Sequence, residues 1–111
     1  MRLLSTKILS QNFRERILMH QFSLVERAFI KISFLQNPKI DGIFDRLIFT
    51  SQNAVNAVFS SPKIQKIING KKFYCVGKKT ASLLAENGQK TTKIAQNSLE
   101  LAHFLANNHQ N

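Results

Sequence analysis

The sequence predicts an α/β protein in which a mainly parallel sheet is flanked by helices. Short apolar runs with strand-forming residues alternate with segments of helical period. Two strand-to-helix turns have the same form, at residues 47–55 and 73–81: an apolar run ends in small or hydroxyl residues and then opens a helix. Strands joined through helices in this way lie parallel, with right-handed crossovers.

The first part of the chain is expected to fold as strand, helix and strand. Residues 3–5 form a short apolar strand, and Ser10 can cap a helix that runs through about residue 20. One face of that helix carries Phe13, Ile17 and Leu18. Residues 22–35 alternate apolar and polar side chains, which predicts one or two further strands.

Residues 37–45 are the predicted linker, because a proline, an aspartate and a glycine cluster there between two apolar runs. A domain boundary in this stretch would leave a partial β-α-β unit over residues 1–36. Residues 46–111 would then form a second α/β unit.

The second unit is expected to begin with a strand at residues 46–49, followed by a helix from about Gln52. The inner side of that helix is expected to carry Ala54, Val55, Val58 and Phe59. Pro62 is well placed to start a short helix through Ile68, since proline favours the first helical position.

A strand at residues 72–76 leads to a helix over about 79–87, which Gly88 can end in the left-handed conformation. Residues 90–94 form the next strand. The last helix starts at Asn97, where Asn-Ser-Leu-Glu has the spacing of a capping box. Its apolar contacts are expected from Leu101, Ala102, Phe104 and Leu105.

The charge balance favours an anionic partner. Sixteen Lys and Arg stand against six Asp and Glu in 111 residues, a formal charge of +10. Nucleic acid, an acidic membrane surface and a polycarboxylate or phosphate ligand all fit that charge. No apolar run reaches the ~20 residues of a membrane span, and no signal peptide is recognisable, so we expect a cytoplasmic protein without membrane contact.

The nine phenylalanines would suit nucleic acid if they alternated with basic residues on an exposed strand face. Phe29, Phe34, Phe49 and Phe73 instead fall in predicted strands that a parallel sheet would bury, which disfavours nucleic acid. The role of Tyr74 stays open at this stage.

Other site chemistry is weakly supported. Cys75 is the single cysteine and lies in an apolar run, which predicts a buried, inert thiol. His20, His103 and His109 have no carboxylate or cysteine partners at metal-ligand spacing, so no metal site is expected. No nucleophile and base pair is recognisable, and we assign no catalytic residue.

The first of the two similar turns can bind an anion at the open N–H groups of its helix. Thr50 or Ser51 can cap the helix, and Asn53 can add a side-chain amide. The alternative is that the hydroxyl is a plain N-cap with no ligand.

In the second turn Gly77 lets the backbone approach a ligand closely, while Lys79 adds charge and Thr80 a hydroxyl. A P-loop is excluded: Gly70 and Gly77 are seven residues apart where that motif requires five, and a second lysine follows Lys78. This spacing argues against ATP binding.

Four stretches together resemble uroporphyrinogen-III synthases. Residues 47–55, Leu-Ile-Phe-Thr-Ser-Gln-Asn-Ala-Val, match the family's TS-x-x-AV element, and residues 76–88 match VG-x-x-TA-x-x-L-x-x-x-G. Residues 3–7 resemble the first strand of the family, with Lys7 where many members carry arginine, and residues 97–102 resemble the S-x-x-LA helix start. The four elements stand in register and span nearly the whole chain.

The resemblance implies two flavodoxin-like α/β lobes with the linear tetrapyrrole hydroxymethylbilane in the cleft between them. The reaction closes the macrocycle, loses water and inverts the last pyrrole ring through a spiro intermediate, without metal or cofactor. Thr50, Ser51 and Asn53 would line one side of the cleft. Gly77, Lys79 and Thr80 would contact substrate carboxylates, with Lys7 as a further candidate.

Family members are considerably longer, so the resemblance implies an incomplete first lobe and a second lobe that lacks its last strands. A truncated product, half of a split enzyme and a small relative remain open. The partner would be a complementary C-terminal half or a second copy. The alternative function is a non-enzymatic basic α/β module that binds nucleic acid or a protein partner, with salt-dependent binding in the nucleic-acid case.

Overall fold

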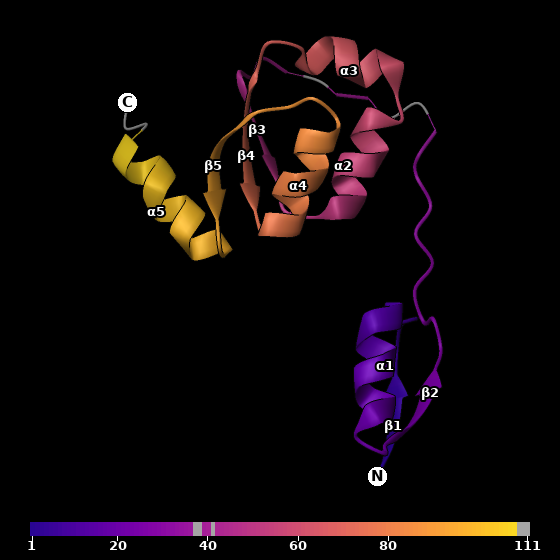
Figure 1. Cartoon of the computed structure of the whole chain (residues 1–111). Coiled ribbons are helices and arrows are strands. Elements are labelled where there is room, and N and C mark those ends of the chain that lie inside the picture. Colours follow the sequence, from indigo (N-terminus) through magenta and orange to yellow (C-terminus); the bar gives the residue numbers. More distant parts are fainter. Residues whose placement is uncertain (37–38, 41, 109–111) are drawn as a thin grey trace. The chain divides into compact units, whose positions relative to one another are not determined.

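The computed structural model describes residues 1–36, 39–40 and 42–108, and these contain five strands and five helices (Figure 1). The predictions for Pro38, Asp41 and His109 lie outside the described residues. The strands are β1 (Arg2–Ser5), β2 (Ser23–Glu26), β3 (Arg46–Phe49), β4 (Lys72–Val76) and β5 (Thr91–Ala95). The helices are α1 (Gln11–Met19), α2 (Gln52–Phe59), α3 (Pro62–Ile68), α4 (Lys78–Glu86) and α5 (Ser98–Asn108).

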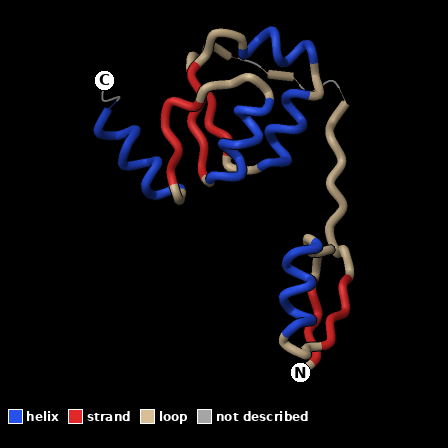
Figure 2. Tube along the Cα trace, in the orientation of Figure 1, coloured by secondary structure: helices blue, strands red, loops and turns tan. Residues whose placement is uncertain are grey.

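The chain divides into two compact units, an N-terminal unit (Met1–Ser33) and a C-terminal unit (Phe34–Asn111). Each unit has its own parallel sheet, with one helix, α1, in the N-terminal unit and four helices, α2 to α5, around the sheet of the C-terminal unit (Figure 2). This is the α/β class with parallel sheets and flanking helices that the sequence predicts. The assignment of residues 1–36 and 46–111 to two lobes of a larger enzyme stays a prediction.

In the N-terminal unit, β1 and β2 pair in parallel, with Leu3 opposite Leu24, and α1 connects them. Ser10 caps α1 as expected, because its side chain accepts a hydrogen bond from the N–H of Phe13 at 3.4 Å. The Arg14 guanidinium ties α1 to β2 through a 2.6 Å contact with the Glu26 carboxylate.

The run at residues 22–35 forms one strand, β2, in line with the predicted one or two strands. On α1, Ile17 is half-buried while Phe13 and Leu18 are exposed, because one helix on a two-stranded sheet leaves most of its apolar face uncovered. The expectation that Phe29 and Phe34 lie in buried strands is wrong. Phe29 and Phe34 lie outside any strand and are exposed, since no neighbouring strand pairs with that stretch in the described chain.

The C-terminal unit has a three-stranded parallel sheet of order β3-β4-β5. One face packs against α2, α3 and α4, and its core consists of Phe49, Val55, Ile64, Ile68, Phe73, Cys75, Ala81 and Leu84. Helix bounds follow the expected signals: Pro62 starts α3, and Gly88 has a φ of 76° after α4. Ala54 and Ala102, expected inside, are exposed because they lie on the outer sides of their helices.

The opposite face of this sheet carries α5 (Figure 1). Tyr74, Ala95 and Leu101 are buried there, with Phe104 and Leu105 packed against them. Tyr74 is therefore a core residue, which resolves the open question about its role. With helices on both faces, the strands of the sheet can direct ligand-binding groups only from their ends.

Candidate functional site

The two similar turns lie at one edge of the C-terminal sheet, where the strands end; we call it the carboxyl edge. β3 and β4 are adjacent and parallel, with Phe49 opposite Cys75. The chain therefore leaves both strands on the same side, and the segments that begin at Thr50 and Gly77 are neighbours. In open α/β sheets, ligands bind at this edge.

In the first turn, the Ser51 hydroxyl is engaged by its own helix. It accepts a hydrogen bond from the N–H of Ala54 at 3.3 Å, with extended backbone at φ −148°. The side chains of Thr50 and Asn53 are exposed and make no hydrogen bond within the described chain. Ser51 shapes this turn, while Thr50 and Asn53 are free to meet a ligand.

In the second turn, the N-terminus of α4 has no side-chain cap. Gly77 is the N-cap, with φ 94° and ψ 143°, and no side chain hydrogen-bonds to the first turn. The N–H of Ala81 bonds to the Gly77 carbonyl at 3.2 Å, so the N–H groups of Lys78, Lys79 and Thr80 precede the helical ladder. These three donors, at the positive end of the helix dipole, form the most open anion-binding position of the edge.

The conformation of Gly77 explains why glycine occupies this position. Its φ and ψ lie close to a region that only glycine adopts readily. A Cβ here would meet only the Thr80 Oγ1, at 4.0 Å, so space is not the constraint. The Gly77 N–H donates to the Ala95 carbonyl at 2.8 Å, which fixes the turn to the end of β5.

The lysines and Thr80 have different surroundings. Lys78 and Lys79 are exposed and can place positive charge at the carboxyl edge. Thr80 is only 5% exposed, so its hydroxyl lies inside the turn rather than on its surface. Of the two predicted site residues Lys79 and Thr80, Lys79 is therefore the one whose side chain is accessible to a ligand.

A third turn ends at the same edge after β5, and the sequence interpretation did not consider it as a site. Asn97 accepts a hydrogen bond from the N–H of Glu100 at 2.8 Å. The Glu100 carboxylate accepts from the N–H of Gln96 at 2.7 Å and lies 3.7 Å from the Lys93 Nζ. This turn already holds a carboxylate of its own chain. The capping-box spacing of residues 97–100 was the sequence signal that could have excluded this turn as an anion-binding site.

Lys7 belongs to the N-terminal unit, just after β1. Its N–H donates to the Ser5 hydroxyl at 3.3 Å, and the same hydroxyl donates to the Lys7 carbonyl at 2.6 Å. The side chain is exposed. Whether Lys7 joins the other candidates at one ligand stays a prediction.

Cys75 is fully buried in β4, and burial raises the pKa of its thiol. Its Sγ lies 3.9 Å from the Gly77 carbonyl oxygen, within range of a weak hydrogen bond. The thiol is thus protonated and inaccessible, as the sequence predicts. Within residues 1–36, 39–40 and 42–108, no group of three or more His, Cys, Asp or Glu is placed to hold a metal ion.

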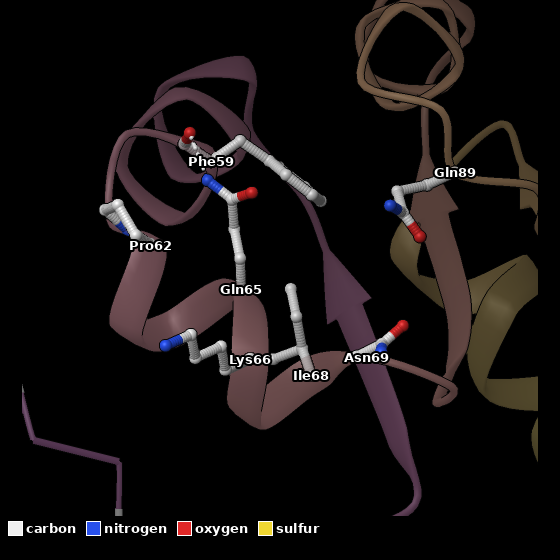
Figure 3. Close-up of a pocket in the computed structure, with 7 residues that line it drawn as sticks. All are labelled: Phe59, Pro62, Gln65, Lys66, Ile68, Asn69 and Gln89. Carbon is white, nitrogen blue, oxygen red and sulfur yellow. Dashed lines mark hydrogen bonds between the residues drawn. The ribbon is translucent and has the colours of Figure 1, made fainter.

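A cavity of about 380 Å³ lies away from these turns (Figure 3). Its lining comes from Phe59, Pro62, Gln65, Lys66, Ile68, Asn69 and Gln89. These residues precede β4 and β5 in the chain, so the cavity is at the opposite edge of the sheet. The Gln65 side-chain amide donates a hydrogen bond to the Phe59 carbonyl at 2.7 Å. None of the predicted site residues lines the cavity.

Comparison with known proteins identifies the family. No curated protein and no solved structure matches the chain significantly. Among the described residues, no helix has both the length and the apolar character needed to cross a membrane. The sequence profile described as Uroporphyrinogen-III synthase HemD matches residues 11–111, nearly the whole chain and both units. The chain therefore belongs to the uroporphyrinogen-III synthase family.

Proposed function

We propose that the carboxyl edge of the C-terminal sheet binds carboxylates of hydroxymethylbilane and forms one wall of a uroporphyrinogen-III synthase site. The observation that carries the proposal is the uncapped N-terminus of α4 behind Gly77, next to the turn of Thr50. Three open N–H donors and the exposed residues Lys78 and Lys79 lie in the first turn of α4, which begins at that edge. A substrate with eight carboxylates is the kind of ligand that such groups favour.

The residues of this edge would position the substrate rather than transfer protons. In the proposed reaction the hydroxymethyl carbon loses its hydroxyl as water, and the substituted α carbon of ring D bonds to it to give the spiro intermediate. The bond between that α carbon and its original bridge carbon then breaks, and the bridge carbon bonds to the other α carbon of ring D, which loses a proton, so the macrocycle closes with ring D inverted. Holding the two ends of a flexible chain in one geometry removes much of the entropic barrier. Thr50, Asn53 and Lys79 would hold peripheral carboxylates, and Ser51, Gly77 and Thr80 would maintain the shape of the two turns.

The direct test is the isomer that forms from hydroxymethylbilane. The chain, alone or mixed with a complementary C-terminal fragment of a family member, is expected to divert the substrate from the spontaneous type I product to the type III isomer. The isomers are separated by chromatography. If only type I forms with the complement supplied, the synthase proposal is wrong for this chain.

Charge at the site is tested with two matched variants. Lys79→Gln and Lys90→Gln each remove one exposed positive charge, but Lys90 precedes β5 at the opposite edge. Lys79→Gln is expected to weaken substrate binding about tenfold, and Lys90→Gln by much less. Binding is measured by fluorescence or calorimetry with a stable linear tetrapyrrole carboxylate. Equal effects would indicate general charge attraction rather than this edge.

The net charge of +10 also supports the second candidate, a basic module that binds nucleic acid. That function predicts binding to many duplex sequences, with an affinity that falls steeply as salt rises. Titration of an arbitrary duplex at two salt concentrations separates the two functions. Tight tetrapyrrole binding without duplex binding supports the synthase proposal.

A further inference from the structure

The edge of the C-terminal sheet where its strands begin, which we call the amino edge, carries the cavity of about 380 Å³ shown in Figure 3. The lining residues come from the end of α2, from α3 and from the turns that lead into β4 and β5. All of them belong to the C-terminal unit. The volume is typical of a site for one small molecule, about 300–1000 Å³, and is too small for a linear tetrapyrrole.

The walls of the cavity are fixed by the fold. Ile68 is only 2% exposed and Phe59 packs half-buried against the core, so their apolar side chains form its inner surface. The N–H of Lys71 donates to the Ile68 carbonyl at 3.2 Å and holds the end of α3. On the other side, the N–H of Gln89 donates to the Leu84 carbonyl at 3.0 Å. A cavity with fixed walls loses little conformational entropy when a ligand binds.

Three side-chain amides around the cavity have groups that the described chain does not use. Gln65 donates to the Phe59 carbonyl at 2.7 Å, and its Oε1 accepts no hydrogen bond from the described residues. Gln89 donates to the Asn87 carbonyl at 3.3 Å, and its Oε1 is open in the same way. The Asn69 side chain makes no hydrogen bond within the described chain, so it offers both a donor and an acceptor. In Figure 3 Asn69 and Gln89 point toward each other.

Lys66 gives the cavity a positive charge. Its side chain is exposed and extends away from Gln89 in Figure 3. No aspartate or glutamate is among the described residues that line the cavity. The cavity therefore combines an apolar inner surface with open amides at one end and a cation at the other. A ligand that matches these features has a flat polar ring at one end and an anionic group at the other.

We propose that this cavity binds an adenine nucleoside monophosphate, with the base at Asn69 and Gln89 and the phosphate at Lys66. An asparagine amide pairs with adenine through two hydrogen bonds, because it donates to a ring nitrogen and accepts from the amino group. The second proton of that amino group is donated to the Gln89 Oε1. Phe59 and Ile68 supply apolar surface for the face of the base. Lysine is a common phosphate ligand in proteins.

The ligand is tested by titrating the full chain with adenosine monophosphate and following the side-chain amide resonances by NMR. The resonances of Asn69 and Gln89 are expected to shift, and inorganic phosphate alone is expected to leave them in place. Inosine monophosphate has an oxygen in place of the amino group and would set it against the Gln89 Oε1. It is therefore expected to bind about tenfold more weakly. Shifts at Asn53, on the carboxyl edge, without shifts at Asn69 would overturn the proposal.

The phosphate contact is tested with two matched variants. Lys66→Gln and Lys63→Gln each remove one exposed positive charge from α3, but only Lys66 lines the cavity. Lys66→Gln is expected to raise the dissociation constant of adenosine monophosphate about fivefold, and Lys63→Gln to change it much less. The affinity for adenosine, which has no phosphate, should be the same in both variants. Equal effects of the two variants on the monophosphate overturn the proposal.

The base contact is tested with Asn69→Ala, at an exposed position. This variant is expected to bind adenosine monophosphate about tenfold more weakly, because it removes both hydrogen bonds to the base. Tetrapyrrole binding at the carboxyl edge should stay unchanged, so this proposal and the synthase proposal can fail separately. Equal binding of the adenine and inosine nucleotides by the wild-type chain, or unchanged binding in Asn69→Ala, overturns the proposed base contacts.

Discussion

The Ser51 hydroxyl accepts a hydrogen bond from the backbone N–H of Ala54 at 3.3 Å, so it caps α2 from the end of β3. Thr50, one residue earlier, is exposed and makes no hydrogen bond within the described chain. Two neighbouring hydroxyls therefore have different tasks. One stabilises a helix, and the other is open to a ligand.

Replacing Ser51 should affect stability, and replacing Thr50 should affect binding. Ser51→Ala is expected to lower the free energy of unfolding by about 1 kcal/mol, because it removes an N-cap. Thr50→Val is expected to leave stability within about 0.5 kcal/mol, as for other surface changes, but to weaken tetrapyrrole binding. Urea unfolding and ligand titration measure the two effects. Equal loss of stability in both variants would contradict this division.

Gly77→Ala is expected to destabilise the C-terminal unit by about 1–3 kcal/mol, because alanine is strained at φ 94° and ψ 143°. No clash contributes, since the nearest atom to the added Cβ is the Thr80 Oγ1 at 4.0 Å. Urea unfolding measures the change in the free energy of unfolding.

Gly88→Ala is the matched control for Gly77→Ala. Gly88 has φ 76° and open space around its Cβ position, and it lies at the end of α4 rather than at the carboxyl edge. The Gly88→Ala substitution is expected to lower the free energy of unfolding by about 1–2 kcal/mol through backbone strain alone. Tetrapyrrole binding by the folded fraction should fall only for Gly77→Ala. A similar loss of binding in both variants would show that the second turn has no specific role.

The N-terminal unit should lose stability in acid. Hydrogen bonds from the Arg14 side chain and the Leu9 N–H hold the pKa of Glu26 below its usual value. A carboxyl group whose pKa is lowered by folding stabilises the fold above its unfolded pKa. That contribution disappears as the pH falls from about 4.5 through the folded pKa.

The NMR shift of the Leu9 amide, which donates to Glu26 at 2.8 Å, reports this titration directly. Its midpoint is expected below pH 4.5. In Glu26→Gln the Leu9 titration should vanish and the unit should be weaker at neutral pH. A wild-type midpoint above the ordinary glutamate value would show that the Arg14 contact does not form in solution.

Cys75 should report unfolding of the C-terminal unit. The thiol is buried and its pKa is raised by burial, so a thiol reagent at pH 8 should react only after the sheet opens. Labelling should become rapid in urea at the same midpoint as the loss of secondary structure. Ser82→Cys, at an exposed position of α4, supplies the control thiol that reacts at once. Rapid labelling of the native wild-type chain would contradict the burial of β4.

The sequence by itself determined the elements and their ends, because those depend on neighbours along the chain. Ser10 and Ser51 cap their helices, Pro62 starts α3, and Gly88 adopts a positive φ after α4. Each signal acts within a few residues, so no knowledge of the fold is needed to recognise it. The family could be inferred in the same way, from the spacing of residues within these turns.

Tertiary structure decided which apolar residues are covered and which turns are open. Tyr74 is buried because α5 packs on the second face of the sheet, whereas Phe29 is exposed because no strand pairs with its segment. Both residues lie in similar apolar runs, so the burial of each side chain depends on packing partners that are distant in the sequence. Burial and access to a ligand depend on packing, which local sequence does not encode.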